Sequence, residues 1–314
     1  MTGPHPRRFR FGVEMMRPFP SMSWAESARE LERLGYATLF VPDHFHEGFG
    51  PITAMATAAA ATTRLIVAPM VLACDFRNPA VLARELASID VLSEGRLEVG
   101  LGAGYNPLDY SRSGIRHDPP GVRVDRLIEH TAVLRGLFAD HGPFTFHGQH
   151  YQIADLDGTP KPYNVDGPPI IIAGGGQRLL TFAATHADII GVNPSLPGAP
   201  DASTARDALG PAIDRKFDLI RDAAGDRFDA LEFTAWISAA VITDDTTLVR
   251  DRMAARFGVH ADDALESPIV LAGSVERIVD QLHRRRQRWG YSYTVVQANR
   301  AHAFAPIVER LAGQ

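Results

Sequence analysis

The feature that most constrains the fold of this chain is the regular alternation of short apolar segments with segments of helical periodicity. Apolar strands are predicted at 9–15, 38–42, 64–72, 96–101, 169–173, 188–192, 232–243 and 291–297. Helical patterns lie between these strands, and a last helix follows the eighth. Strands that alternate with helices are typical of parallel sheets. The pattern therefore predicts a closed (β/α)8 TIM barrel, with residues 1–314 forming one domain.

Several helix boundaries are marked by individual residues. Ser23 and Glu26 have the spacing of a capping box, which predicts a helix that ends at Gly35. Asn78-Pro79 predicts an N-cap followed by proline at the first helical position. Two insertions are expected, near 140–168 and 193–210. The first contains an alternating segment typical of a hairpin outside the barrel, and the second has the composition of a functional lid or a disordered loop.

Two glycine-rich segments follow predicted strands. Gly100-Leu101-Gly102-Ala103-Gly104 closes the fourth strand and leads to Tyr105, and Ala173-Gly174-Gly175-Gly176 closes the fifth. Glycine lets the backbone approach a ligand without a Cβ atom in the way. The second segment leads directly into a helix, whose free N–H groups can point at a phosphate. Together they predict a large, flat, phosphorylated cofactor at the mouth of the parallel strands.

Composition argues against several classes of function. The formal net charge is −5, which argues against a general nucleic-acid surface. The single cysteine, Cys74, excludes an intramolecular disulfide framework and a Cys-x-x-Cys metal site, and we interpret it as a small packing residue. No apolar run reaches the roughly 18 residues of a membrane span, and the first ten residues contain no apolar signal segment. We expect a soluble cytoplasmic protein with no nucleic-acid or membrane partner.

Several motifs together resemble those of the bacterial luciferase-like superfamily. They are Val41-Pro42-Asp43-His44-Phe45, Asp75-Phe76-Arg77-Asn78-Pro79, Ser93-Glu94-Gly95-Arg96 and the two glycine-rich segments, and the resemblance covers about residues 9–193. The Asp-His pair and the first glycine segment are most similar to the branch that uses coenzyme F420, a 5-deazaflavin. The branch that uses FMN shares the barrel, so FMN is the alternative cofactor.

The resemblance implies roles for individual residues. It implies a cofactor ring over the strand mouth, supported from behind by a cis non-proline peptide bond at Met70-Val71. It implies that His44 is catalytic and stabilises or delivers a proton beside the reactive edge of the ring, because imidazole titrates near neutral pH. Asp43 would orient that imidazole or bond the ring, and the alternative is a turn residue.

The glycine segments would hold the remainder of the cofactor. Gly102, Ala103, Gly104 and Tyr105 would let its ribityl chain and phosphate pass close to the backbone. Ala173, Gly174, Gly175 and Gly176 would receive the phosphate through N–H groups, with added charge from Arg178. The alternative is that these glycines serve only tight turns.

The chain departs from the deazaflavin-dependent sugar-phosphate dehydrogenases of this superfamily at two positions. Tyr105 stands where those enzymes have a glutamate, and Gly48 stands where they have a tryptophan. We therefore do not expect sugar-phosphate oxidation. Apolar side chains near the predicted mouth favour an apolar or aromatic substrate instead. They are Met15, Met16, Phe45, Phe49, Phe76 and Trp236.

These observations predict an F420-dependent oxidoreductase that transfers a hydride to or from a small organic substrate and acts as a homodimer. The alternative is a luciferase-like monooxygenase that uses reduced FMN. Two further classes stay open. One is a metal-dependent barrel hydrolase that uses Asp43, His44 and His46, because carboxylate and imidazole groups can ligate metals. The other is a non-catalytic cofactor-binding protein.

Overall fold

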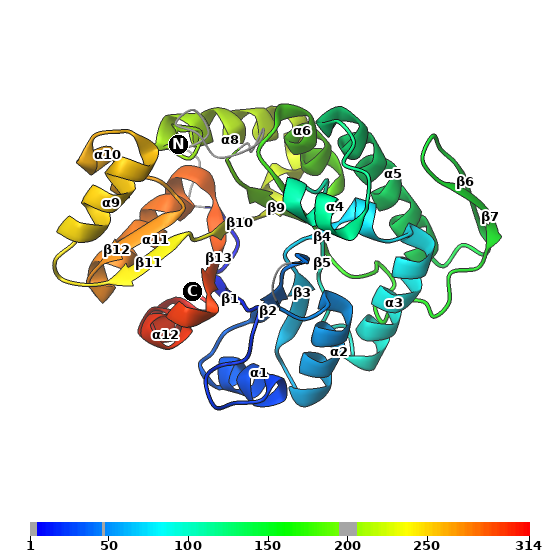
Figure 1. The fold of residues 1–314 in the computed structure, drawn as a ribbon, viewed down its shortest axis with the longest axis horizontal. Helices are drawn as coiled ribbons and strands as arrows, with labels where there is room; N and C mark the ends of the chain where they lie inside the picture. Colours follow the sequence, from blue (N-terminus) through cyan, green and yellow to red (C-terminus); the bar gives the residue numbers. More distant parts are fainter. Residues whose placement is uncertain (1–4, 46–47, 195–205) are drawn as a thin grey trace. The chain divides into compact units, whose positions relative to one another are not determined.

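The computed structural model describes residues 5–45, 48–194 and 206–314. The chain divides into two compact units, whose helices and strands are labelled in Figure 1. The first unit comprises Met1–Glu14, Leu31–Ala37 and Ala173–Gln314, and the second comprises Met15–Glu30 and Thr38–Ile172. The organisation of residues 1–314 as one domain stays a prediction.

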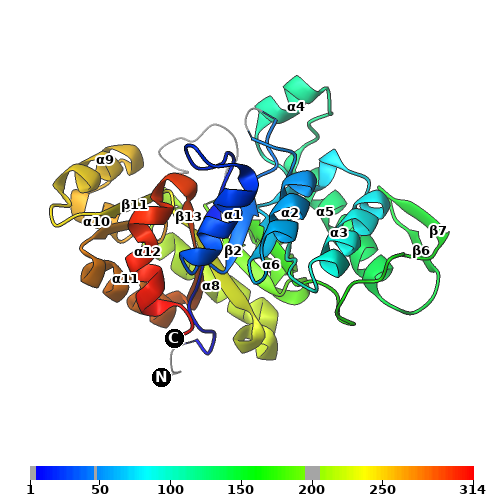
Figure 2. The ribbon, with the colours of Figure 1, turned by 90° about the horizontal axis from the view of Figure 1, so that it is seen from below.

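The second unit contains parallel strands that alternate with helices, as predicted. β2 (Thr38–Val41) pairs in parallel with β3 (Ile66–Pro69), and β4 (Leu72–Ala73) pairs in parallel with β5 (Val99–Gly102). β5 also pairs with the first residues of β8 (Ile170–Gly174). The helices α2 (Pro51–Ala61) and α3 (Pro79–Leu92) lie side by side, as Figure 2 shows.

The predicted helix starts are confirmed by their hydrogen bonds. At the start of α1 (Trp24–Arg33), the Ser23 N–H donates to Glu26 Oε2 at 2.7 Å, and the Glu26 N–H donates to Ser23 Oγ at 3.2 Å. This reciprocal pair is the predicted capping box. At the start of α3, Asn78 Oδ1 accepts from the Ala80 N–H at 2.9 Å. Local side-chain chemistry therefore determines where both helices begin.

The third predicted strand, 64–72, is wrong as one continuous element. It consists of β3 and β4, which are separated at Met70-Val71 by a cis peptide bond, as the resemblance implied. Glycines of β5 make room for this break. A Cβ atom on Gly102 would lie 2.6 Å from Val71 Cγ2, and one on Gly100 would collide with the carbonyl oxygen of Pro69. The first two glycines of the Gly-x-Gly-x-Gly segment are therefore required by packing.

Helix α4 (Pro107–Ser113) was not predicted from the sequence. Asn106 caps it by accepting from the Leu108 N–H at 3.2 Å, and Gly114 ends it in the left-handed region with φ +76°. Figure 2 shows α4 standing away from α2 and α3. The helix that follows, α5 (Pro120–Phe138), lies in the interval between the fourth and fifth predicted strands, where a helical pattern was expected.

The predicted hairpin is confirmed. β6 (Phe144–His147) and β7 (Gln152–Leu156) pair in antiparallel fashion and form a separate two-stranded sheet. The turn is attached to α5 through the carboxylate of Glu129. This carboxylate accepts N–H bonds at 2.7, 2.8 and 3.1 Å from Gln149, His150 and Tyr151.

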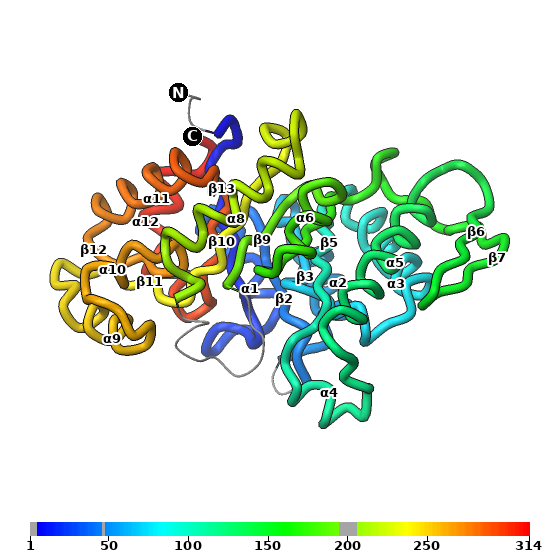
Figure 3. Tube along the Cα trace, turned by 90° about the horizontal axis from the view of Figure 1, so that it is seen from above, coloured from blue at the N-terminus to red at the C-terminus, as the bar shows by residue number. Residues whose placement is uncertain are grey.

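The first unit also has a parallel sheet. β1 (Arg10–Glu14) pairs with β13 (Tyr291–Gln297), β13 with β10 (Glu232–Trp236), and β10 with β9 (Ile189–Val192). The accompanying helices are α6 (Gln177–His186), α8 (Gly210–Ala224), α11 (Val275–Trp289) and α12 (Ala301–Leu311). α6 and α8 pack side by side (Figure 3).

The predicted strand at 232–243 is wrong in extent. It divides into β10 and β11 (Ala239–Ile242), and β11 pairs with a strand that was not predicted, β12 (Val270–Gly273). Between β11 and β12 lie α9 (Thr247–Phe257) and α10 (Ala261–Leu265). Of the predicted loop at 193–210, residues 195–205 lie outside the described residues. Among the residues that the structure describes, no helix combines the length and apolarity needed to cross a membrane.

Candidate active site

His44 lies just after β2 and is held by a carboxylate from α4. Its Nδ1 atom is 2.7 Å from Asp109 Oδ2, and the other oxygen of Asp109 accepts the Phe45 N–H at 3.1 Å. Asp109 therefore fixes both the imidazole ring and the backbone beside it. Sequence reasoning missed Asp109, which is separated from His44 by 65 positions. The signal that could have found it is Asn106-Pro107, which repeats the helix-start pattern of Asn78-Pro79.

The environment of Asp109 favours its charged form. Burial by itself would raise the pKa of this carboxyl group, since its side chain is only 5% exposed. The hydrogen bonds from His44 and from the Phe45 N–H outweigh burial and hold the pKa of Asp109 below its ordinary value. A carboxylate at Nδ1 favours the ring form that carries a proton there. Proton exchange with a substrate would then occur at Nε2.

Asp43 has a different role from the predicted orientation of His44. Its carboxylate accepts two bonds from the Arg77 guanidinium, at 2.6 and 2.9 Å, and a third from the Ala73 N–H at 3.1 Å. These contacts join the end of β2 to the end of β4. The structure gives the orienting contact on His44 to Asp109 instead. The predicted bond between Asp43 and a cofactor ring stays a prediction.

One aromatic ring contacts the imidazole, and the next residue along the chain packs against another aromatic ring. The ring of Tyr105 meets His44 edge-on, with centroids 5.8 Å apart and an interplanar angle of 88°. Phe45 packs against Phe76 at 5.0 Å. Phe45 is 55% exposed and Tyr105 is 52% exposed, so both are accessible to a ligand. Gly48 has φ +92°, and a Cβ atom there would lie 2.9 Å from the Met16 carbonyl oxygen. This explains why the position carries no side chain.

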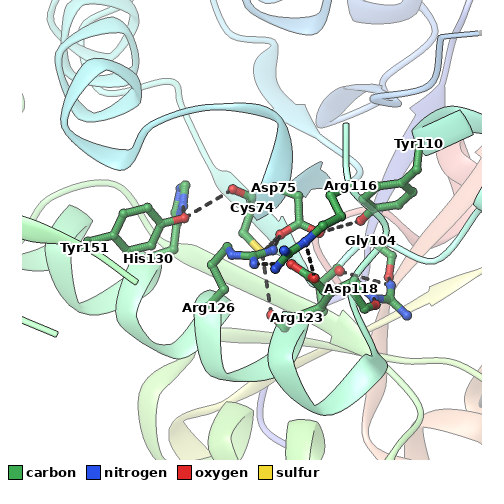
Figure 4. Close-up of polar contacts among 11 residues, drawn as sticks. Cys74, Asp75, Gly104, Tyr110, Arg116, Asp118, Arg123, Arg126, His130 and Tyr151 are labelled. Atoms are coloured by element: carbon green, nitrogen blue, oxygen red, sulfur yellow. Dashed lines mark hydrogen bonds and ion pairs between the residues drawn. The ribbon is translucent and has the colours of Figure 1, made fainter. Parts of the chain in front are cut away.

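Gly104 lies beside a network of hydrogen bonds and ion pairs, which Figure 4 shows in close-up. Gly104 has φ +68°, and the hydroxyl group of Tyr110 occupies the space that a Cβ atom would need. The same hydroxyl donates to Asp75 Oδ2 at 2.7 Å. Arg123 donates to the carbonyl oxygens of Ala103 and Gly104. Packing therefore requires glycine at 104, and contact between residues 102–105 and a cofactor stays a prediction.

Asp75 is the centre of this network. Its second oxygen pairs with Arg126, which also binds Asp118 at 2.6 Å. Burial by itself would lower the pKa of Arg126, but Asp118 and Asp75 raise it above its ordinary value. At the other end of the network, the Tyr151 hydroxyl lies 3.3 Å from His130 Nδ1 (Figure 4).

Cys74, next to Asp75, is buried, and burial raises the pKa of its thiol above the ordinary value. This supports the interpretation of Cys74 as a packing residue rather than a nucleophile.

The second glycine segment lies in the first unit. Ala173 and Gly174 end β8, and Gly176 is the N-cap of α6 with φ −79° and ψ 144°. No side chain caps this helix start, and a Cβ atom on Gly176 would meet nothing within 4 Å. A Cβ atom on Gly174 would collide with the side chain of Leu179. A phosphate contact at the exposed backbone of Gly176 stays a prediction, whereas Gly174 is required by packing.

The first unit also places a polar pair at the ends of β1 and β10, the two strands on either side of β13. Glu14 ends β1, and its carboxylate accepts from the Trp236 indole N–H at 2.9 Å at the end of β10. No signal in the sequence pointed to Glu14, and Trp236 was predicted only as an apolar residue that lines the substrate pocket. Met15 was predicted to line the same pocket, but its side chain is fully buried in the core.

The described residues contain no group of three His, Cys, Asp or Glu side chains placed to hold a metal ion. His46, one of the three ligands of the hydrolase alternative, lies outside the described residues. Asp43, another, is engaged by Arg77. The described residues therefore give the metal-dependent hydrolase no support.

Comparison with known proteins identifies the family. The family model described as luciferase-like monooxygenase matches residues 22–247. The chain belongs to this family. The F420-dependent glucose-6-phosphate dehydrogenase of Amycolatopsis mediterranei is 31% identical over 172 residues. That match covers 52% of this chain and 50% of the relative, so the chain spans about half the length of that protein.

Solved structures that are similar to this chain show the fold. The coenzyme F420-dependent tetrahydromethanopterin reductase of Methanopyrus kandleri aligns with a TM-score of 0.76 at 16% identity, covering 98% of this chain and 99% of that one. A type II Baeyer-Villiger monooxygenase from Pseudomonas putida, in complex with FMN, aligns with a TM-score of 0.68 at 18% identity, covering 97% and 96%. The predicted barrel fold is therefore confirmed.

Proposed function

We propose that this chain is a coenzyme F420-dependent oxidoreductase that transfers a hydride to or from a small apolar or aromatic substrate. The observation that carries the proposal is the His44–Asp109 pair, 2.7 Å apart, with the Tyr105 ring edge-on to His44 and the adjacent Phe45 packed on Phe76. It combines a proton-transfer group with an apolar surface for a substrate. Similarity to an F420-dependent dehydrogenase and an F420-dependent reductase supports the choice of cofactor.

Within each unit, the residues that we assign to the cofactor would suit a part of a phosphorylated deazaflavin. The uncapped N-terminus of α6, with open space at Gly176, suits a phosphate. Ala173, Gly174, Gly175 and Arg178 would complete that contact. Met70 and Val71 would support the ring, and residues 102–105 with Asp43 would contact its edges. When bound, a deazaflavin supplies a carrier that exchanges a hydride with the substrate and reacts poorly with oxygen.

His44 would supply the proton that accompanies hydride transfer. Because Asp109 occupies Nδ1, Nε2 is the atom that takes up or releases the proton. The charged Asp109 stabilises the imidazolium that forms when Nε2 takes a proton. Tyr105 packs edge-on against the ring and limits its movement. Asp109 thus fixes which atom of His44 acts, and the neighbouring aromatic rings keep the surroundings apolar.

The experiment that tests the proposal is a titration of the purified protein with F420 and, separately, with FMN, followed by fluorescence. We expect F420 to bind with a Kd of about 1 μM or tighter, equivalent to about −8 kcal/mol, and FMN to bind more weakly. Anaerobic mixing with aromatic and alicyclic alcohols, ketones and enones would then show hydride transfer as a change in deazaflavin absorbance. Tighter binding of FMN would overturn the proposal.

The second candidate is a monooxygenase that uses reduced FMN. The description of the family model and the FMN complex of the Pseudomonas putida neighbour favour it. Oxygen consumption with reduced FMN and a substrate, in the absence of F420, would identify this activity. Binding of either cofactor without turnover of any compound in the panel would instead support a cofactor-binding protein.

We further expect a homodimer, which light scattering on the purified protein would test.

A further inference from the structure

We propose that Tyr110 is a positioning residue that sets the proton form and orientation of His44 by fixing helix α4. The inference rests on the proposed function only in its consequence for turnover. The part that concerns His44 itself can be measured without any cofactor or substrate.

Helix α4 has few contacts of its own. It contains seven residues, and only Asp109 and Tyr110 among them are buried, at 4% and 1% exposure. Leu108, immediately before them, is 55% exposed. A helix this short is unstable in isolation, so its position depends on its tertiary contacts. The two buried side chains are therefore what places the helix.

The two buried side chains point in different directions. Neighbouring residues on a helix are separated by about 100° around its axis, because one turn takes 3.6 residues. Asp109 reaches His44 and the Phe45 N–H, whereas Tyr110 reaches Asp75. The contacts of Tyr110 thus determine the rotation of α4, and that rotation determines where the carboxylate of Asp109 lies.

Tyr110 makes a hydrogen bond through its hydroxyl group and two aromatic contacts through its ring. Its hydroxyl donates to Asp75 at 2.7 Å, and Asp75 is itself held by Arg126. Its ring stacks on His117 with centroids 4.3 Å apart and meets Phe76 at 5.4 Å. In Figure 4 the hydroxyl points from α4 toward Asp75, beside Gly104. Removal of this hydroxyl takes away the polar anchor and leaves the ring contacts in place.

The test is the Tyr110→Phe variant, with the imidazole nitrogens of His44 observed by 15N NMR in the protein without cofactor, at about pH 8. A His44→Gln spectrum assigns the signals. We expect the wild-type ring to carry its proton on Nδ1, and Tyr110→Phe to shift the population toward Nε2. Asp109→Asn removes the carboxylate itself and should move the whole population to the ring form that is protonated at Nε2. Tyr151→Phe is the matched control, because Tyr151 lies in the same network without a bond to Asp75, and it should leave the signals unchanged.

Turnover provides the second readout. Tyr110→Phe should lower kcat roughly tenfold, as loss of a positioning contact does, with KM and the F420 Kd nearly unchanged.

Unchanged His44 signals in the folded Tyr110→Phe protein would overturn the inference. If that variant does not fold, Asp75→Asn is the substitute, because it weakens the acceptor of the Tyr110 hydroxyl. It should shift the signals in the same direction by less, and an unchanged spectrum would overturn the inference equally. Failure to bind F420 would refute the proposed function and leave the NMR result intact.

Discussion

At the residue scale, the proposed chemistry depends on the pairing of His44 with Asp109. The His44→Ala variant should reduce turnover by roughly 10²–10⁴-fold, because it removes a general acid or base. The affinity for F420 should change much less, since the predicted phosphate contacts lie elsewhere in the chain. Steady-state kinetics and a fluorescence titration on the same preparation measure both quantities.

The matched control for this variant is His147→Ala, which removes a histidine of β6 in the separate hairpin. It should turn over at the wild-type rate. Equal turnover of His44→Ala and His147→Ala on a confirmed substrate would contradict a catalytic role for His44.

A second prediction at this scale concerns His130, which is buried on α5. Burial lowers its pKa to about 4 from the ordinary value of 6.5. Between these two pH values the unfolded chain binds a proton that the folded chain excludes. The free energy of unfolding should therefore fall as the pH is lowered from 6.5 to 4, by at most about 1.4 kcal/mol per pH unit from this group. Above pH 6.5 the contribution is constant.

Urea unfolding of the wild type and of His130→Gln between about pH 4.5 and 7.5 isolates this effect, because other histidines contribute equally to both proteins. We expect the wild type to lose more stability than the variant as the pH falls through the window. Parallel curves for the two proteins would show that His130 titrates normally in the folded state.

At the element scale, the start of α6 offers a test of the phosphate site. Gly176→Ala should fold, because φ is −79° and nothing lies within 4 Å of the added Cβ atom. If a phosphate approaches this backbone, the methyl group should weaken F420 binding about fivefold or more, which corresponds to about 1 kcal/mol. Titration with F420 and thermal melting of the same preparation separate binding from stability.

Gly121→Ala, in the first turn of α5, is the control, because its Cβ atom also enters open space. It should leave F420 affinity unchanged. Equal affinities for Gly176→Ala, Gly121→Ala and the wild type would remove the phosphate from the α6 terminus.

Elements with a local signature could be predicted from the sequence, and those whose formation depends on distant contacts could not. The start of α3 follows from Asn78-Pro79, and the hairpin follows from the alternation at 144–153. Helix α4 was not predicted, because its seven residues are too few to show a helical pattern of apolar side chains. Asn106-Pro107 and Gly114 nevertheless mark its ends. The break in the third strand depends on Gly100 and Gly102 of another strand, which no window over 64–72 contains.

At the scale of the whole molecule, the barrel was predictable because alternating strands and helices leave few other architectures. The candidate site was predictable only in part. His44 and the glycine segments follow from motifs, whereas Asp109 comes from a helix 65 positions further along the chain. A pattern read along the sequence gives no measure of that distance in space. The glycines show a second limit. Contacts with Val71 and Tyr110 already require glycine at 102 and 104, and a glycine motif in the sequence does not distinguish such a packing requirement from a ligand contact.

Binding of the correct cofactor should stabilise the whole chain. At a free concentration of about 100 times Kd, F420 should add about 2.7 kcal/mol to the free energy of unfolding and raise Tm by several degrees. FMN at the same concentration should raise Tm less, because we expect it to bind more weakly. Differential scanning fluorimetry or calorimetry measures both shifts. A larger shift with FMN would favour the monooxygenase alternative.

The burial of Cys74 makes this chain a convenient host for chemical labels. The sequence contains one cysteine, and the structure places its thiol 1% exposed with a raised pKa, so maleimide reagents should leave it unmodified in the folded protein. A cysteine introduced at an exposed position, such as Leu108→Cys on α4, would then be the sole reactive thiol. A fluorophore attached there would report on α4 in real time, without prior removal of the native cysteine.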